Sequence, residues 1–410
     1  MTRAVADRRP KIAIVRGHLA TPWELRPWER LLDRFDVSYL LSDRNDFDVS
    51  SLRVPSIPVR TLRGRLPGGR VGDVVAGMAG ERYFDLERHL AGFDVVHAEE
   101  LSFWFAAEAA RVKGAPGCGW RLVQTVWETI PFLRAYRNRE ARANRERVLA
   151  ATDLFLAATE RARDSLRLEG VPAERIEVCP PGIDLERFRG APGGPEPEEH
   201  VILSPGRLVW EKGHQDVLRA VAALRRGVVG DGGVPAPRVR IVGGGPEEER
   251  LRSYADELGI ADRVELGGVP YDEMPGVYAR ASALVLASLP MAGAGFHPFD
   301  VPRVFWEEQF GMVLAEAMAA GLDVLTTTSG AIPEVVGDSA TYFAPGDWIA
   351  LARLLAEGPL ARPPGARVEH ARERVERYST EAAAARLGDA YERLIRSSTA
   401  SASAAVRSQE

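Results

Sequence analysis

The chain has 410 residues, which is enough for two or three domains at roughly 150 residues each. Its hydrophobic content of 45% and charged content of 27% are ordinary for a soluble globular protein, and a net charge of −5 gives no signal for nucleic-acid binding. The two cysteines, Cys118 and Cys179, have no C-x-x-C spacing, which argues against a disulfide framework or a zinc–cysteine site. No apolar signal-peptide core or membrane span is evident, so we expect a cytoplasmic protein.

Short apolar or β-branched segments alternate with helical segments through the first part of the chain. Helices are expected, for example, at 102–113 and 134–150. This alternation predicts βαβ units and a parallel sheet, which binds ligands at the carboxyl ends of its strands. The expected strands are KIAIV (11–15), DVVHA (94–98), RLVQTV (121–126), LFLAAT (154–159) and RIEVCP (175–180).

A second series of the same kind follows GAPGGPEPEEH (190–200), a Gly-, Pro- and Glu-rich stretch typical of a linker. Its expected strands are HVILSPG (200–206), RVRIVGG (238–244), DRVELGG (262–268), ALVLAS (283–288) and DVLTTT (323–328).

The two series predict two Rossmann-like, doubly wound α/β domains, residues 1–190 and 200–378, facing each other across a cleft. A helix at about 380–396 is expected to pack back on the first domain, and the tail 397–410 to be disordered.

One turn after a predicted strand carries two cations. The stretch SPGRLVWEKG (204–213) turns at Gly206 and enters a helix near Gly213, with Arg207 and Lys212 flanking the turn. Lys212 is the only lysine in the C-terminal half of the chain. A pyrophosphate favours a guanidinium fork and a compact ammonium, and a helix N-terminus adds N–H donors. The alternative is a surface loop with two solvated cations.

Another glycine turn, VGGGPEEERL (242–251), also joins a strand to a helix. Gly243 permits close approach of a ligand to the backbone. This is no G-x-G-x-x-G fingerprint, and a tight turn without a ligand explains these residues equally well.

EEQFGMVLAEAMAAG (307–321) combines an apolar helical stripe with two acids. Glu308 precedes the helix, and Glu316 stands at the edge of the stripe, about 12 Å further along the axis if both were helical. A carboxylate that accepts hydrogen bonds from a diol tolerates partial desolvation, and ribose and hexose both offer diols. The alternative is a surface glutamate together with one that interacts with the helix dipole.

These segments resemble a known family. EEQFGMVLAE is similar to the E-x7-E motif of retaining GT-B glycosyltransferases of the GT4 family (group 1), with Glu308 and Glu316 as its acids, and SPGRLVWEKG is similar to the family's G-R-x-x-x-x-K-G. The resemblance covers nearly the whole C-terminal half of the chain and, thinly, the N-terminal half. Three further segments match in order: VGGGPEEERL, CPPGIDLERF (179–188) and SGAIPEVVGD (329–338).

The resemblance implies that the C-terminal domain holds a nucleotide-sugar donor and the N-terminal domain an acceptor. Arg207 and Lys212 would bind the donor phosphates and stabilise the leaving diphosphate. Glu316 would bind the ribose and Glu308 the transferred sugar; Glu308, Arg207 and Lys212 are the implied catalytic residues. The implied donor-binding residues are Gly17, Gly206, Arg207, Lys212, Gly243, Glu308, Phe310, Gly311, Met312, Val313 and Glu316.

No metal or other cofactor is expected, because fixed cations can oppose the charge on the departing phosphate. Asp46-Phe47-Asp48 is similar to the D-x-D of metal-dependent glycosyltransferases of another fold. It falls in a loop-like segment, and we expect an ordinary turn there.

The N-terminal half departs from the family pattern at three places. The loop VRGHLATPW has one glycine, Gly17, where relatives often have a pair. His97-Ala98-Glu99 replaces the frequent H-x-H, and Trp127 stands where many relatives have the histidine of T-x-H. The acceptor-side candidates are therefore His18, His97, Glu99, Trp127 and Glu128.

Two segments keep alternative interpretations. RAYRNREARANRERV (134–148) carries six arginines, either as a solvated face with i,i+4 pairs or as a peripheral contact of Arg134–Arg147 with the inner membrane face. The insert at 288–306 is either a mobile lid or a surface Ω-loop.

Together these features predict transfer of a hexose from a UDP- or GDP-linked sugar to a hydroxyl acceptor, such as a glycan, a lipid or a small metabolite, with retention of configuration. The alternatives are a GT-B nucleotide-sugar epimerase and a catalytically silent GT-B protein that serves as a binding scaffold.

Overall fold

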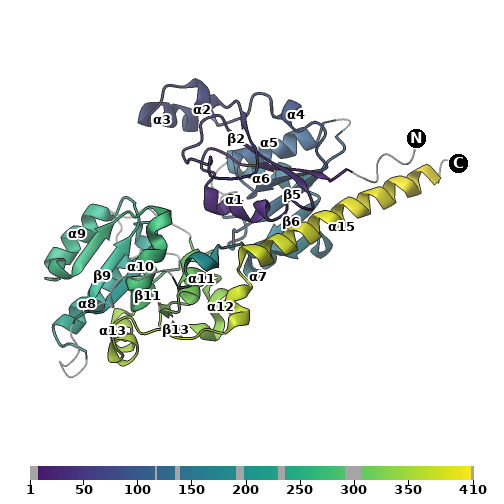
Figure 1. The fold of residues 1–410 in the computed structure, drawn as a ribbon. Helices are drawn as coiled ribbons and strands as arrows, with labels where there is room; N and C mark the ends of the chain where they lie inside the picture. Colours follow the sequence, from purple (N-terminus) through teal and green to yellow (C-terminus); the bar gives the residue numbers. More distant parts are fainter. Residues whose placement is uncertain are drawn as a thin grey trace. The chain divides into compact units, whose positions relative to one another are not determined.

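The computed structural model describes residues 8–115, 118–133, 139–190, 198–229, 236–290 and 306–407, without the side chains of 70 and 398–407. The chain divides into two compact units (Figure 1). Unit 1 comprises Met1–Gly182 and Ser379–Glu410, and unit 2 comprises Ile183–Tyr378.

Unit 1 is built on a parallel sheet of seven strands in the order β3-β2-β1-β4-β5-β6-β7. The strands are β1 (Lys11–Val15), β2 (Asp36–Ser42), β3 (Ser56–Val59), β4 (Val95–Glu99), β5 (Arg121–Val126), β6 (Leu154–Ala157) and β7 (Ile176–Val178). The helices are α1 (Pro22–Glu29), α2 (Leu62–Arg65), α3 (Arg70–Ala79), α4 (Leu86–His89), α5 (Trp104–Lys113), α6 (Arg139–Ala151), α7 (Glu160–Leu168) and α15 (Thr380–Arg407).

Helices cover both faces of this sheet, because β1 has apolar residues on both sides. Ala13 and Val15 face a core with α5, α6 and α7. Ile12 and Ile14 face a second core with α1 and α15. A strand buried on both faces reads as a continuous apolar run, as KIAIV does.

The helix α15 returns from unit 2 to pack on α1. Its Tyr391 is buried, and the hydroxyl lies 2.8 Å from the indole nitrogen of Trp28, which donates to it. The helix runs beyond the predicted end at 396, through residues predicted to be disordered, since the Ala- and Ser-rich sequence contains no helix breaker. The boundary between the units falls at 182/183, before the predicted linker at 190–200.

Unit 2 repeats the design with six parallel strands in the order β10-β9-β8-β11-β12-β13. Its strands are β8 (Val201–Pro205), β9 (Arg238–Val242), β10 (Val264–Gly267), β11 (Ala283–Leu286), β12 (Asp323–Thr326) and β13 (Thr341–Tyr342). Its helices are α8 (His214–Arg225), α9 (Glu248–Glu257), α10 (Met274–Arg280), α11 (Met312–Ala319), α12 (Ile332–Val336), α13 (Trp348–Glu357) and α14 (Arg372–Glu376). Helices α8, α9 and α13 share one core with the sheet, and α11 contacts β11 and β12.

Each sheet has one point at which the strand order reverses. In unit 1 it lies between β1 and β4, and in unit 2 between β8 and β11. The connections leave these neighbouring strands in opposite directions, which opens a crevice at their carboxyl ends. The predicted doubly wound architecture is confirmed for both units.

Candidate active site

An ion pair lies at the reversal point of unit 2. Lys212, in the short 3-10 helix Trp210–Lys212 after β8, donates to both carboxylate oxygens of Glu308 at 2.9 and 2.7 Å. Ser288, which follows β11, donates from its hydroxyl to Glu308 Oε2 at 2.8 Å. The ammonium also lies 4.9 Å from the Trp306 ring centroid. The structure thus brings together two predicted catalytic residues that stand 96 positions apart.

Backbone contacts fix the position of Glu308 itself. Its N–H donates to Ser329 Oγ at 3.2 Å, and its carbonyl accepts from Ala331 N at 2.8 Å. A Cβ on Gly330 would lie 2.1 Å from that carbonyl oxygen. The segment SGAIPEVVGD therefore holds the backbone of Glu308 in position. This gives the motif a structural role, although it carries no catalytic side chain.

The predicted glycine turns of unit 2 contact each other. A Cβ on Gly243 would lie 1.9 Å from the carbonyl oxygen of Gly206, so only glycine fits there. Gly213 has a left-handed backbone with φ of 71°, and a Cβ there would lie 1.9 Å from the Ala287 carbonyl oxygen. These close approaches hold the ends of β8, β9 and β11 together around Lys212.

A buried histidine, which the sequence analysis missed, supports the Arg207 turn. The Nε2 of His214 lies 3.1 Å from the Arg207 carbonyl oxygen, and its Nδ1 lies 2.8 Å from Ser204 Oγ. Burial lowers the pKa of His214 to about 4, so the ring is neutral at pH 7, with Nε2–H donating to the carbonyl. The Arg207 side chain is exposed, and no described residue hydrogen-bonds to it, so its guanidinium is available to a ligand.

The N-terminus of α11 lies next to Glu308 in sequence. Gly311 is the N-cap residue of the helix and has a φ of 81°. Because glycine has no side chain, no capping side chain bonds the first amides of the helix, at Met312 and Val313. Both residues are partly exposed. Phe310 differs: it is 2% exposed and packs edge-on against Tyr378, with ring centroids 5.1 Å apart. Its side chain therefore belongs to the core.

Glu316 is more buried than the sequence suggested. Its residue is 4% exposed, and its carboxylate accepts from Tyr278 at 2.6 Å and from Tyr271 at 3.4 Å. Burial raises the pKa of the Glu316 carboxyl, and the two phenols oppose that rise. The guanidinium of Arg187 stacks on Tyr271 at 4.7 Å from the ring centroid and also favours the charged acid.

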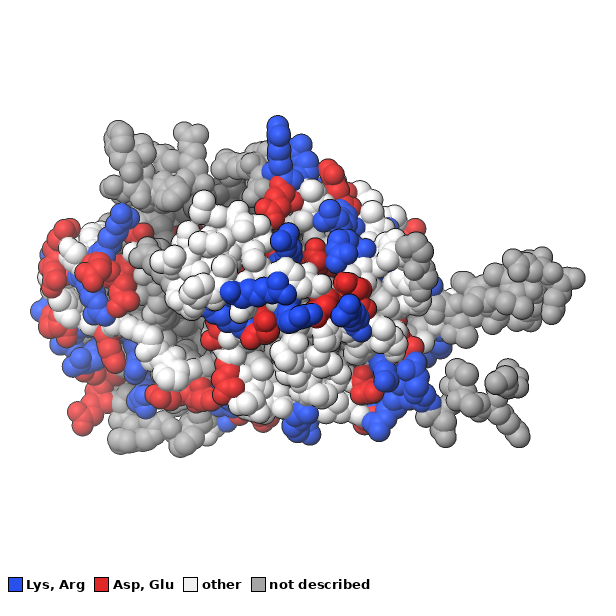
Figure 2. All heavy atoms as spheres, turned by 90° about the horizontal axis from the view of Figure 1, so that it is seen from above, with Lys and Arg blue, Asp and Glu red and all other residues white. Residues whose placement is uncertain are grey.

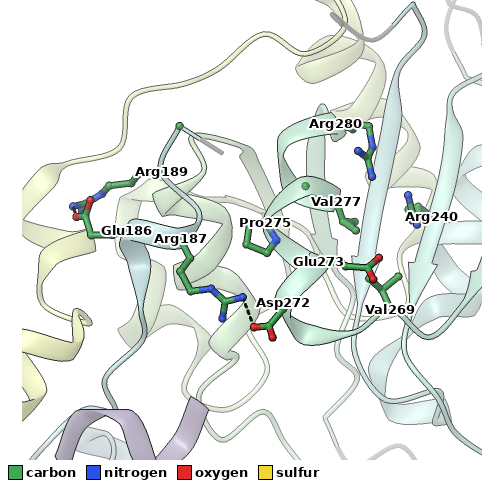
Figure 3. A pocket seen from close by; sticks show the side chains of 12 residues that line it. Glu186, Arg187, Arg189, Arg240, Val269, Asp272, Glu273, Pro275, Val277 and Arg280 are labelled. Atoms are coloured by element: carbon green, nitrogen blue, oxygen red, sulfur yellow. Dashed lines mark hydrogen bonds and ion pairs between the residues drawn. The ribbon is translucent and has the colours of Figure 1, made fainter. Parts of the chain in front are cut away.

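A cavity of about 620 Å³ lies in unit 2 beside this group (Figure 3). Arg240 from β9 and Arg280 from α10 face the same space, and Arg187 binds Asp272 at 2.9 Å. Arg189 is paired with Glu186. Acids thus neutralise several of the arginines that line the cavity.

The reversal point of unit 1 carries another ion pair. Buried Arg16, directly after β1, lies 3.0 Å from Glu99 at the end of β4. The Trp127 indole donates to Glu99 at 2.6 Å, and the Trp127 backbone N–H donates to Glu100 at 2.8 Å. The structure thus brings the predicted Glu99 and Trp127 together, and it adds Arg16, which the sequence analysis did not single out.

His97 is separated from that group. It is fully buried, with Nδ1 2.5 Å from Tyr391 Oη on α15 and Nε2 2.8 Å from Thr125 Oγ1. Burial, together with the charge of Arg16, lowers the pKa of His97 well below its ordinary value. Both nitrogens are thus engaged within the core of unit 1.

The other candidates of unit 1 lie in loops. Glu128 accepts from the Ile130 backbone N–H at 2.9 Å, which makes it a turn-forming residue. Gly17 is buried, and a Cβ there would lie 2.9 Å from Phe105. His18 lines a pocket of about 490 Å³ with Arg63, among other residues, and burial lowers the His18 pKa.

Three further observations concern the segment at 46–48, possible metal ligands and the residues outside the described ranges. Asp48 accepts from both the N–H and the hydroxyl of Ser50, and residues 46 and 47 form a bend in the loop after β2. Within the described residues, no group of three or more His, Cys, Asp or Glu side chains is arranged to hold a metal ion. Residues 134–138 of the basic segment and 291–305 of the insert lie outside the described residues.

Comparisons with known proteins agree with this architecture. Residues 190–358 match the family described as "Glycosyl transferases group 1", and residues 38–187 match "Glycosyltransferase Family 4". The two matches together span most of both units. The chain contains a glycosyl transferases group 1 domain and a glycosyltransferase family 4 domain.

Several named glycosyltransferases are similar in sequence to this chain. It is 34% identical over 224 residues to a "GDP-mannose-dependent alpha-(1-6)-phosphatidylinositol monomannoside mannosyltransferase" of Mycobacterium tuberculosis, which is 52% of each protein. The aligned part thus spans about half the length of that relative. A "D-inositol 3-phosphate glycosyltransferase" of Corynebacterium jeikeium is 29% identical over 79% of this chain and 83% of the relative.

The fold is that of GT-B glycosyltransferases. The structure of Anabaena HepE in complex with UDP-glucose aligns over 93% of this chain and 99% of that one, with a TM-score of 0.67 and 16% identity. At that identity the likeness concerns the fold alone.

Proposed function

We propose that the chain is a retaining hexosyltransferase, which moves a hexose from a UDP- or GDP-linked sugar to a hydroxyl acceptor. The observation that carries the proposal is the Lys212–Glu308 pair, held at the reversal point of unit 2 beside two glycine turns and the α11 N-terminus. Family membership supports the reaction class. Relatives named for GDP-mannose use, and fold neighbours named as UDP-glucose complexes, support the donor class.

In this proposal, Lys212 and Arg207 bind the diphosphate from two directions. Lys212 is a compact, partly buried ammonium, and Arg207 is an exposed fork. The amides of Met312 and Val313 add N–H donors at a helix N-terminus. When the anomeric C–O bond breaks, these fixed positive groups stabilise the charge that develops on the departing phosphate, without reorganisation.

Glu308 has two roles in the proposal. Before the donor binds, its carboxylate holds the Lys212 ammonium in place. When a diphosphate takes over the ammonium, the carboxylate becomes an acceptor for a hydroxyl of the transferred hexose, while Ser288 keeps it oriented. Glu316 would accept from the ribose hydroxyls through the lone pairs that Tyr278 and Tyr271 leave unused.

The acceptor is proposed to bind unit 1 at the carboxyl ends of β1, β4 and β5. Arg16, Glu99 and Trp127 present mixed donors and acceptors there, which suits a hydroxyl-bearing ligand. The departing phosphate would assist deprotonation of the acceptor, so no histidine base is required. No metal or other cofactor is part of the proposal.

A membrane contact of α6 remains a prediction. None of the helices in the described ranges combines the length and the apolar character of a membrane-spanning segment. On α6 itself, Ala141 and Val148 face the core, and Arg145 is paired with Glu169. Arg139, Arg142 and Arg147 on α6 are exposed.

The test is calorimetric binding of UDP, GDP and ADP in the absence of metal. Wild type should bind one nucleotide selectively, and Lys212→Ala should weaken that binding by about tenfold or more, since it removes a charge-assisted bond to phosphate. Lys11→Ala is the control, because it removes a lysine from the start of β1. Failure of all three nucleotides to bind would overturn the donor assignment and favour the scaffold alternative.

A further inference from the structure

The segment CPPGIDLERF (179–188) packs against the helix that carries Glu316. Near its end lies the 3-10 helix Leu185–Arg187, which contacts α11, and Phe188 follows it. The ion pair at the reversal point of unit 2 comes from other segments. The contact with α11 therefore connects this segment to Glu316 rather than to the ion pair.

Among the described residues, two tyrosine hydroxyls orient the Glu316 carboxylate. Tyr278, on α10, donates at 2.6 Å, and Tyr271, in the 3-10 helix Tyr271–Glu273, donates at 3.4 Å. Burial and the nearby carboxylate raise the pKa of both phenols, so both stay protonated and serve as donors. A ribose hydroxyl has to use the lone pairs that these donors leave, so the places of the two tyrosines determine the direction of ribose binding.

Phe188 holds one of these tyrosines. Its ring packs edge-on against Tyr278, with ring centroids 5.0 Å apart and an interplanar angle of 72°. Phe188 is 2% exposed and Tyr278 is fully buried, so close packing fixes both rings. The direction of the Tyr278 hydroxyl therefore depends on Phe188.

Arg187 holds the other tyrosine. Its guanidinium carbon lies 4.7 Å from the Tyr271 ring centroid, and its Nη2 donates to the Tyr271 carbonyl oxygen at 3.3 Å. The same nitrogen donates to Asp272 at 2.9 Å (Figure 3). The stacking contact fixes the ring, and the hydrogen bonds fix the backbone that carries it.

The charge of Arg187 also acts on Glu316, because little water surrounds the guanidinium. On the face that Figure 2 shows, basic and acidic side chains lie side by side at the surface, where water screens them. The Arg187 side chain is only 17% exposed, whereas that of its partner Asp272 is 85% exposed. Arg187 counteracts the rise that burial causes in the pKa of Glu316. It thus favours the ionised acid, which is the stronger acceptor for a hydroxyl.

We propose that Arg187 and Phe188 are positioning residues for Glu316. Acting through the two tyrosines, they hold the carboxylate in the direction that a ribose diol requires. This role rests on the proposed function, in which Glu316 accepts from the ribose hydroxyls. The alternative is a direct contact of Arg187 with the nucleotide, since Arg187 also lines the cavity of about 620 Å³.

The test compares calorimetric binding of UDP, GDP and ADP with binding of their 2′-deoxy forms. For the nucleotide that wild type binds, the deoxy form should bind at least about tenfold more weakly, since it lacks a hydroxyl that donates to a carboxylate. Arg187→Met and Phe188→Leu should each reduce this preference to about threefold or less. A merely structural role would weaken binding of both forms equally and leave their ratio unchanged.

The matched control is Arg189→Met, which removes another arginine close by in the chain. Arg189 pairs with Glu186 and Glu376, so this variant should keep the wild-type preference. A double-mutant cycle of Arg187→Met with Tyr271→Phe distinguishes positioning from direct contact. Positioning predicts that Arg187→Met changes the preference little once the Tyr271 hydroxyl is absent, whereas direct contact predicts additive losses.

Glu316→Ala distinguishes failure of the positioning role from failure of the proposed function. If no nucleotide binds, if wild type has no preference for the ribose form, or if Glu316→Ala retains that preference, the assignment of Glu316 to the ribose is wrong and the positioning role is overturned with it. If Glu316→Ala removes the preference while Arg187→Met and Phe188→Leu keep it, the positioning role alone is overturned. Additive losses in the cycle would also overturn it for Arg187 and would assign that residue to the nucleotide itself.

Discussion

Replacing Lys212 by methionine should destabilise unit 2 more than a surface lysine substitution does. The ammonium and the Glu308 carboxylate have side chains that are 13% and 7% exposed, so water screens their attraction only weakly. Lys212→Met keeps the length of the side chain but leaves the carboxylate, within the described residues, with one side-chain donor, the Ser288 hydroxyl. Breaking a buried pair on one side costs about 3–5 kcal/mol, and the remaining hydroxyl favours the lower value.

A loss of about 3 kcal/mol corresponds to a fall in unfolding temperature of about 6–12 °C for a unit of about 200 residues. Scanning calorimetry without nucleotide measures it directly. Glu308→Gln should cost less, because the amide oxygen still accepts from the ammonium. In a double-mutant cycle, Lys212→Met and Glu308→Gln should couple by at least about 1.5 kcal/mol.

A fall of less than about 2 °C for Lys212→Met, without coupling to Glu308→Gln, would refute this reasoning. The pair would then behave like a solvent-exposed ion pair, worth at most about 1 kcal/mol. The pair would then contribute little to the stability of unit 2. The proposal that Glu308 holds the Lys212 ammonium in place before a phosphate binds would be wrong.

Three further substitutions test other parts of the structure. The pKa of His214, about 4 when folded and about 6.5 when unfolded, makes stability fall as pH drops from 6.5 to 4. Denaturant unfolding at pH 7 and 4.5 should show His214→Gln losing about 2 kcal/mol less than wild type. Gly213→Ala should lower the unfolding temperature by several degrees more than Gly346→Ala, which shares a positive φ but has open space around a Cβ; equal effects would contradict the close approach. Tyr278→Phe should cost about 1–3 kcal/mol in thermal unfolding, because it removes the 2.6 Å donor to the buried Glu316 carboxylate; an unchanged midpoint would show that the bond contributes nothing.

Most strands of both sheets could be predicted from the sequence, because parallel strands that are buried on both faces have continuous apolar sequences. It missed three strands. The strand β2, DVSYLLS, mixes polar residues into its run, and β3, SIPV, contains a proline. The strand β13 has only two residues, too few for any periodicity.

At the site, local sequence predicted which residues carry charge but not what surrounds them. Lys212 and Glu308 were chosen separately, and their direct pairing depends on loops after two different strands. The hydrogen bond from Tyr278 to Glu316 could not be predicted from the sequence around Glu316, because the two residues are 38 positions apart. His97 was selected because the family often has H-x-H at this place. In the structure it follows Val95 by two residues, so both side chains lie on the face of β4 that α15 covers.

The return of α15 to unit 1 has a consequence for synthesis on the ribosome. Unit 2 is a continuous insertion, and a hydrogen bond of 2.8 Å from Ile183 N to Tyr378 O joins its first and last residues. It can therefore complete its fold as soon as it has emerged. Unit 1 begins first but must wait for Tyr391 to cover Trp28 and His97. The half made earliest is finished last, and until then its apolar surface under α15 is the part of the nascent chain most open to chaperones.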